Sequence, residues 1–233
     1  MKTLVGRVLN EKASEIPYVT SLEFFPERFR KFCGMLIVRF EKRKGDKIRD
    51  FIHFGGCTYV EVEIINIGIP IKTTGIITAA HILNREPPNR VKEISAIFLD
   101  SKGAKHKIII ARENYFSSVL HMDNNRDISI LRVPNRPNYL RPCKIMPAEY
   151  IDDLNKHELI AFGCPQGLLG VVWRLKKGSF TICDNEIISS EFSIPGVSGG
   201  GVFVEIGNKI FLAGVHIYVD NETGNLVSVI LKE

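Results

Sequence analysis

A serine in a glycine-rich turn is the residue of this sequence best suited to nucleophilic chemistry. Ser198 lies in the segment Pro195-Gly-Val-Ser-Gly-Gly-Gly-Val-Phe, which leads into an apolar, strand-like run. Glycines permit positive φ angles and close backbone approach, so such a loop can aim several N–H groups at one point. Acyl transfer needs that arrangement, because losing one donor to the oxyanion typically costs about 10²–10³ in rate. An ordinary glycine turn in a β protein explains the segment equally well.

A histidine and an aspartate at the ends of two further strand-like runs extend this interpretation. His81 follows Thr78-Ala-Ala, where small residues allow a tight turn, and Asp127 stands directly before the apolar run Ile-Ser-Ile-Leu. A buried carboxylate needs partners to offset its desolvation, and an imidazole N–H is one such partner. Taken singly, a histidine at a strand end and a surface aspartate at a loop end are the plainer interpretations.

The three segments together resemble a known family. They occur in the order histidine, aspartate, serine, and Thr78–His81 matches the motif Thr-Ala-Ala-His letter for letter. Asp127–Leu131 closely resembles Asp-Ile-Ala-Leu-Leu, and Gly196–Gly200 matches Gly-x-Ser-Gly-Gly. On these motifs the chain resembles the chymotrypsin/trypsin-like serine peptidases, including their compact bacterial members, over about residues 33–231.

This resemblance implies an all-β fold of two perpendicular six-stranded Greek-key barrels, with the active site in the cleft between them. It implies a serine endopeptidase in which Ser198 attacks the scissile carbonyl, His81 transfers the proton and Asp127 orients the imidazole. The N–H groups of Gly196 and Ser198 would form the oxyanion hole. Val197 replaces the aspartate with which animal digestive members pair a newly cut N-terminus, so we expect no activation of that kind.

Substrate preference is predicted from the expected pocket for the residue before the cut, the P1 residue. His216 lies in Ala213-Gly-Val-His, a context similar to that of glutamyl endopeptidases and of viral peptidases that cut after glutamine. A histidine N–H and a hydroxyl both donate to a carboxylate or amide oxygen, which favours Glu or Gln at P1. A core histidine bonded to a backbone carbonyl is the alternative. The other expected pocket residues are Phe192, Ser193, Ile217, Tyr218 and Val219.

The remaining chain supplies the scaffold that must position these residues. Short runs rich in β-branched residues, separated by Gly, Asn, Asp or Pro, dominate the 233 residues and predict an all-β class. Residues 134–141 carry two prolines in a polar stretch between strand-like runs. We therefore expect an N-terminal arm at 1–32, a first barrel at 33–134, a linker at 135–141 and a second barrel at 142–233.

Composition excludes several classes. Hydrophobic residues make up 45% and charged residues 24%, with no apolar run long enough for a membrane span. The five cysteines form no CxxC pair and the N-terminus is not a signal peptide, so we expect reduced thiols and a cytoplasmic location. No zinc-ligand spacing occurs, and no metal or organic cofactor is implied.

The net charge of +5 has its clearest local source in the segment from Arg39 to Arg49. A solvated hairpin or loop is the interpretation favoured there, since no aromatic interleaving or nucleic-acid motif accompanies the charges. We expect a polypeptide substrate, no membrane contact and no nucleic acid, and leave open a regulatory protein partner. The competing function is a latent or non-cleaving peptide-binding module on the same fold, because fold alone does not decide activity.

Overall fold

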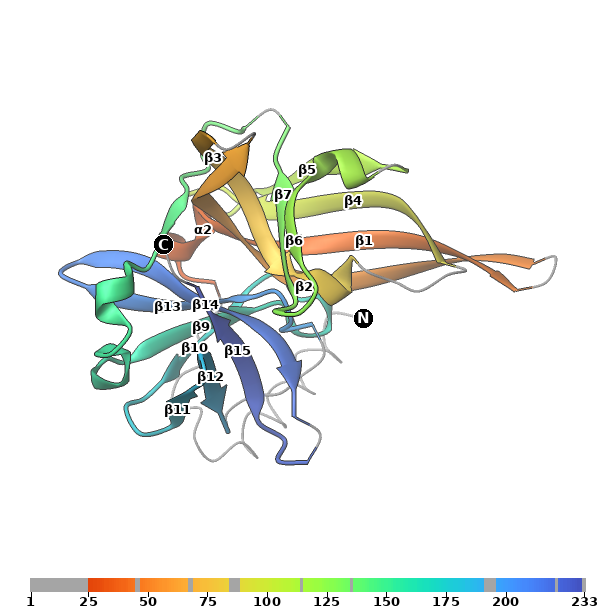
Figure 1. The fold of residues 1–233 in the computed structure, drawn as a ribbon. Coiled ribbons are helices and arrows are strands. Elements are labelled where there is room, and N and C mark those ends of the chain that lie inside the picture. Colours follow the sequence, from red (N-terminus) through yellow and green to blue (C-terminus); the bar gives the residue numbers. More distant parts are fainter. Residues whose placement is uncertain are drawn as a thin grey trace.

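The computed structural model describes residues 25–44, 47–66, 69–83, 89–113, 115–134, 136–190, 196–220 and 222–231. In these ranges strands dominate, with one short α-helix and five 3₁₀ turns (Figure 1). The helical elements are α2 (Glu27–Arg30), η1 (Ala80–Ile82), η2 (Tyr115–Ser118), η3 (Ala148–Tyr150), η4 (Leu154–Lys156) and η5 (Pro165–Gly167). The prediction of an all-β class is confirmed.

The first half of the molecule is a curled antiparallel sheet. Its strands are β1 (Cys33–Lys44), β2 (Lys47–Asn66), β3 (Ile69–Ala79), β4 (Asn89–Leu99), β5 (Lys105–Arg112), β6 (Val119–Asp123) and β7 (Ile128–Arg132). Strand β1 pairs with β2 and β4, while β3 pairs with β2 and β7. The chain segment at Gly75–Ala79 turns into the core, which directs the end of β3 toward the centre of the molecule.

The second half curls in the same way. Its strands are β8 (Cys143–Ile145), β9 (Leu159–Gly163), β10 (Val171–Leu175), β11 (Phe180–Cys183), β12 (Glu186–Ser189), β13 (Gly201–Ile206), β14 (Lys209–Val219) and β15 (Leu226–Ile230). The short strand β8 pairs in parallel with both β2 and β14, so it joins the two halves along one edge. Figure 1 shows the two curled halves side by side with their strands running in different directions.

An aromatic cluster locks the start of the described chain onto the second half. Phe29 in α2 and Phe32 both pack against Phe203 of β13, with ring centroids 5.4 Å apart in each pair. Phe25 packs against Phe162 of β9 at 5.3 Å. Aromatic pairs of this kind add about 0.5–1.5 kcal/mol each beyond their burial. The segment 25–32 therefore bridges the halves before β1 begins, while residues 1–24 of the predicted arm lie outside the described residues.

All five cysteines are free thiols, and four of them are buried: Cys33, Cys57, Cys143 and Cys164. Burial raises the pKa of Cys143 and Cys164 to about 12, and it also raises the pKa of Cys33 and Cys57 well above the ordinary value. Thiols in that state are poor nucleophiles. They act as small apolar side chains in the core. Among the described residues, no helix is long and apolar enough to cross a membrane.

Candidate active site

His81 and Asp127 meet because their strands are paired. Strand β3 ends at Ala79, which pairs with Ile128 at the start of β7. His81 follows the end of β3 and Asp127 precedes the start of β7, so both lie at the same end of this strand pair. The 3₁₀ turn η1, which contains His81, places its imidazole beside the carboxylate of Asp127. Nδ1 of His81 lies 2.6 Å from Oδ2 of Asp127, and the His81 backbone N–H donates to Oδ1 at 2.7 Å.

The two bonds use both oxygens of one carboxylate, which fixes how the ring faces. Because the Asp127 carboxylate accepts a hydrogen bond from Nδ1 of His81, the neutral imidazole carries its proton on Nδ1. Its Nε2 is then a hydrogen-bond acceptor. Asp127 holds this position with a left-handed backbone, φ +55°, a conformation that aspartate and asparagine adopt more readily than most residues. Both side chains remain partly exposed to solvent.

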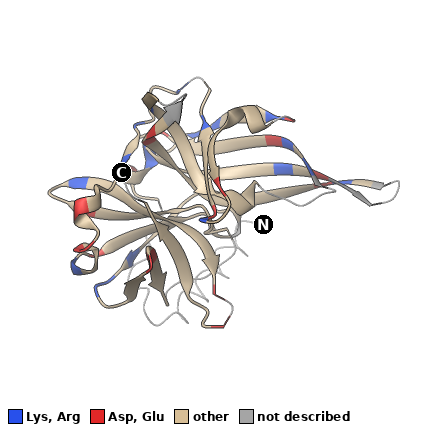
Figure 2. Ribbon diagram, in the orientation of Figure 1, with Lys and Arg blue, Asp and Glu red and all other residues tan. Residues whose placement is uncertain are grey.

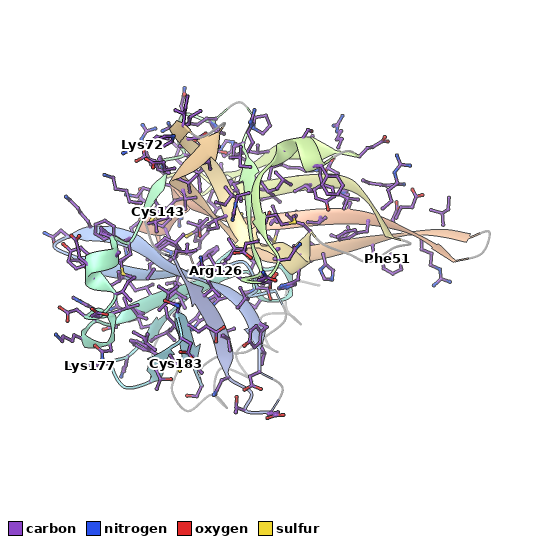
Figure 3. All side chains as sticks on the ribbon, in the orientation of Figure 1. Phe51, Lys72, Arg126, Cys143, Lys177 and Cys183 are labelled. Atoms are coloured by element: carbon purple, nitrogen blue, oxygen red, sulfur yellow. The ribbon has the colours of Figure 1, made fainter. Side chains whose placement is uncertain are left out.

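The loop that carries Asp127 is tied to the other half of the molecule. The guanidinium of Arg126 donates to the carbonyl of Ile230 in β15 at 2.6 Å. Asp123 also accepts the backbone N–H of Arg126, which closes the turn between β6 and β7. Figure 3 places the label of Arg126 between the two halves. This contact connects the His81–Asp127 pair to the strands that surround Ser198.

Ser198 sits in a turn that is hydrogen-bonded to strands of both halves. Its carbonyl accepts the N–H of Gly56 in β2 at 2.8 Å. On the other side, Gly199 donates to the carbonyl of His216 in β14 at 2.7 Å, and His216 donates back to Gly200 at 2.9 Å. The turn therefore lies between β2 and β14 and is held by hydrogen bonds to both.

Close packing brings this turn against the residues that flank His81. A Cβ atom placed on Gly199 would collide with Oγ1 of Thr78 and the carbonyl of Gly56, and would lie 2.9 Å from the side chain of Ile82. Thr78 and Ile82 precede and follow His81 in the chain. No hydrogen bond joins the Ser198 hydroxyl to the His81 ring among the described side chains. In unliganded sites such bonds are often long and tighten only with substrate.

The backbone around Ser198 exposes N–H groups by a tightly held glycine turn. Gly196 has φ +99°, and its carbonyl accepts the N–H of Cys164 at 3.2 Å. Val197, which stands where animal digestive members have an ion-pairing aspartate, is buried and packs against Gly163. Apolar packing therefore holds this position in place of an ion pair. Neither the N–H of Gly196 nor that of Ser198 donates to the carbonyl of a described residue.

His216 is fully buried beside this turn. Its Nδ1 lies 2.7 Å from the hydroxyl of Ser228, its cross-strand partner on β15, and its ring stacks on Trp173 at 5.5 Å and 8°. Burial lowers the pKa of His216 to about 3, so the ring is neutral. Its Nε2 has no hydrogen-bond partner among the described residues. A buried polar atom in that condition is rare and needs an explanation.

The remaining predicted pocket residues divide between described and undescribed segments. Ile217 is buried, Tyr218 is half exposed and Val219 ends β14, while Phe192 and Ser193 lie outside the described residues. Sequence reasoning missed Trp173 and Ser228, which reach His216 from neighbouring strands. It also predicted a backbone carbonyl as the alternative partner of His216, where the structure has a serine hydroxyl.

Comparison with known proteins agrees with this architecture. The fold resembles protease Anisep from Arthrobacter nicotinovorans, with 12% identity and a TM-score of 0.57 over 87% of this chain and 91% of that one. It also resembles a thermostable serine protease, AL20, from an extremophilic microorganism, with 12% identity and a TM-score of 0.58 over 89% and 94%. At this identity the likeness shows the fold, and the double-barrel, chymotrypsin-like prediction is confirmed. No curated protein matches the sequence.

The fold thus places the chain in the double-barrel, chymotrypsin-like class. Residues 67–210, more than half of the chain, match the trypsin-like peptidase domain, and the chain belongs to that family. The matched segment includes His81, Asp127 and Ser198. The domain boundaries and the roles of individual residues stay predictions.

Proposed function

We propose that the protein is a serine endopeptidase with Ser198, His81 and Asp127 as its catalytic triad. One observation carries this proposal: the carboxylate of Asp127 holds His81 by both oxygens, while the turn of Ser198 packs against the residues on either side of His81. These contacts support the proposal that three residues far apart in the sequence act at one site. A triad is identified by the geometry and roles of its members, irrespective of sequence position.

The proposed mechanism follows from the geometry. Oγ of Ser198 attacks the scissile carbonyl carbon while Nε2 of His81 takes the hydroxyl proton, and Asp127 stabilises the imidazolium that forms. The carbonyl oxygen becomes an oxyanion, to which the N–H groups of Gly196 and Ser198 donate. The tetrahedral intermediate collapses as His81 protonates the leaving amine, which leaves an ester on Ser198. Water, deprotonated by His81, then hydrolyses this acyl-enzyme.

A fluorophosphonate probe tests the nucleophile directly. We expect the wild-type protein to be labelled on Ser198, and the Ser198→Ala and His81→Ala variants to lose nearly all labelling, because one lacks the nucleophile and the other its base. Intact-mass measurement of the labelled protein and mapping of the modified peptide provide the readout. Equal labelling of all three proteins would remove Ser198 from this role. Absent labelling together with tight peptide binding would instead favour a non-cleaving module.

We further propose that the P1 pocket prefers glutamine to glutamate. If the Ser228 hydroxyl donates to Nδ1 of His216, then Nε2 carries the proton and donates to an amide oxygen of the substrate. The ring is neutral, and the segment 191–195, Glu-Phe-Ser-Ile-Pro, brings no positive charge to the expected opposite wall. Burying a carboxylate without a counter-charge is costly, whereas a glutamine amide avoids that cost.

The ratio of kcat/KM for matched Gln and Glu peptides measures this preference. We expect Gln to be cut at least about tenfold faster, with a ratio that stays flat between pH 5.5 and 8. The pKa of His216, about 3, lies below that window, so the pocket does not titrate in it. A kcat/KM that favours the Glu peptide at pH 7 to 8, where its side chain is ionised, would contradict the assignment.

We also propose a cytoplasmic location. Five free thiols without a disulfide are the usual pattern of proteins from a reducing compartment. Cell fractionation of the native protein checks this, with recovery in a secreted or periplasmic fraction as the contrary result.

A further inference from the structure

In the described part of the chain, one edge of strand β2 has no strand partner beside the proposed active site. From Thr58 to Asn66 it pairs with β3, but from Lys47 to Cys57 its strand partner among the described residues is β1 alone. That leaves one side of about ten residues without a neighbouring strand. Unpaired strand edges of this length are uncommon in natural proteins, because they invite another chain to pair with them.

The groups that point out of this edge can be assigned from two hydrogen bonds. The N–H of Tyr59 donates to Phe32, on the β1 side of the strand, whereas the N–H of Gly56 donates to Ser198, on the opposite side. In an antiparallel strand the direction of these groups alternates from one residue to the next. The N–H and C=O groups of the even-numbered residues from 48 to 54 therefore face outward.

The same residues present apolar side chains to solvent. Ile48 is 58% exposed, Ile52 is 48% exposed and Phe54 is 38% exposed, and their alternation places them on one face of the strand. Phe51, 46% exposed, belongs to the other face and is labelled on the projecting hairpin in Figure 3. Protected edges usually carry charges or prolines at such positions. This edge combines backbone groups that have no strand partner among the described residues with the apolar side chains of Ile48, Ile52 and Phe54, and the exposed carboxylate of Asp50 interrupts them on the same face.

The edge is continuous with the site of the proposed chemistry. It begins at Gly56, bonded to Ser198, and at Gly55, where a Cβ atom would lie 2.9 Å from the Ser198 carbonyl. Next comes Phe54, whose ring faces Gly167 of η5. Beyond it, β1 and β2 project past the rest of the first half (Figure 1). Strand β14 flanks Ser198 on the side opposite β2. A polypeptide bound across Ser198 would therefore have one half along β14 and its other half along β2.

We propose that the edge of β2 from Ile48 to Phe54 is an exosite that binds the polypeptide substrate downstream of the scissile bond by strand addition. The inference rests on the proposed peptidase function. Backbone pairing would supply affinity, and the stripe of Ile48, Ile52 and Phe54 would favour apolar residues at every second substrate position. Seven residues of strand span about 20 Å, so the substrate would be an extended or unfolded segment rather than a compact loop.

Acidic residues lie among the basic ones on the hairpin and on the neighbouring strand. Figure 2 shows acidic residues beside the basic ones on β1, β2 and β4. Lys92 of β4 pairs with Glu41 at 2.8 Å and with Asp50 at 3.3 Å. A second copy of the chain, pairing edge to edge, is the competing occupant.

An Ile52→Pro variant tests the proposal by removing one outward N–H. Proline is tolerated at strand edges where the N–H faces solvent, so the β1 ladder stays intact. Phe51→Ser on the opposite face is the matched control. The substrates are a fluorogenic glutamine peptide ending two residues after the cut, the same peptide with ten more residues that are alternately apolar, and that long peptide N-methylated at alternate amides.

We expect wild type and Phe51→Ser to show about a tenfold higher kcat/KM for the long peptide than for the short one. Ile52→Pro, and N-methylation of the long peptide, should bring that ratio close to one. An unchanged ratio in either case overturns the exosite. So does a dimer, seen by sedimentation, that dissociates in Ile52→Pro while the ratio persists, because the edge then serves a second copy.

A separate binding experiment distinguishes failure of the peptidase proposal from failure of the exosite proposal. If no peptide is cut in a Ser198-dependent way, the affinities of the long and N-methylated peptides are measured on the full-length Ser198→Ala protein by fluorescence anisotropy. About tenfold tighter binding of the unmethylated peptide, lost in the Ser198→Ala/Ile52→Pro double variant, supports strand addition without catalysis. Equal affinities overturn it.

Discussion

An Asp127→Asn substitution is expected to lower kcat by about 10⁴ while the protein remains folded, the loss typical of a Ser-His-Asp triad. The carboxylate now accepts from both the backbone N–H and Nδ1 of His81. An asparagine that keeps the backbone bond presents its NH₂ group to the imidazole. The ring then carries its proton on Nε2, the atom that must accept the Ser198 proton, and the nucleophile loses its base.

Asparagine is the right replacement because Asp127 has φ +55°. Asparagine tolerates this left-handed conformation, whereas alanine would add backbone strain to the electrostatic change. Asp184→Asn is the matched control, since Asp184 also has a left-handed backbone, φ +49°, and lies in the turn between β11 and β12. Steady-state kinetics and thermal unfolding of the three proteins provide the comparison. A loss of less than about tenfold in Asp127→Asn would mean that Asp127 does not set the tautomer of His81.

The triad candidates could be predicted from the sequence because each lies within a short local motif. Thr78–His81 and Asp127–Leu131 are the end of β3 and the start of β7, and the ladder between those strands brings the two motifs together. Nothing in either motif states that β3 and β7 are neighbours. The family resemblance supplied that arrangement, and the register of Ala79 with Ile128 gives its physical reason.

The surroundings of His216 could not be predicted in the same way. Ser228 and Trp173 contact its ring from β15 and β10, and both contacts depend on which residues face each other across strands. A slip of one residue in register would turn either side chain to the opposite face. The register of β14 with β15 also shifts between His216 and Tyr218, a bulge that no local signal in the sequence marks.

The basic segment from Arg39 to Arg49 was interpreted as a solvated hairpin or loop, and β1 and β2 do form a hairpin. The open edge of β2 in this hairpin could not be predicted from the sequence. Composition marks the charges, but the open edge follows from β3 ending its pairing at Thr58. The alternation of Ile48, Ile52 and Phe54 gains meaning only once that edge is known to lie beside Ser198.

A Gly199→Ala substitution is expected to reduce kcat/KM by at least about 10³ and to destabilise the fold. A methyl group on Gly199 would collide with Thr78 and with the backbone of Gly56, so the turn of Ser198 must move away from β2. That displacement breaks the bonds by which Gly56 and His216 hold the turn. Misplacing a reacting group by about 1 Å can cost 10² in rate, and losing an oxyanion donor costs about 10²–10³.

Gly178→Ala separates the collision from the backbone cost. Gly199 has φ +77° and Gly178 has φ +87°, so alanine suffers a similar left-handed strain at both positions, about 1–2 kcal/mol. No atom lies within 4 Å of a Cβ placed on Gly178, in the turn before β11. Urea unfolding and kcat/KM of the two variants therefore isolate the contact between the turn and β2. If both variants lost stability equally and kept full activity, the packing of Ser198 against the flanks of His81 would have no part in catalysis.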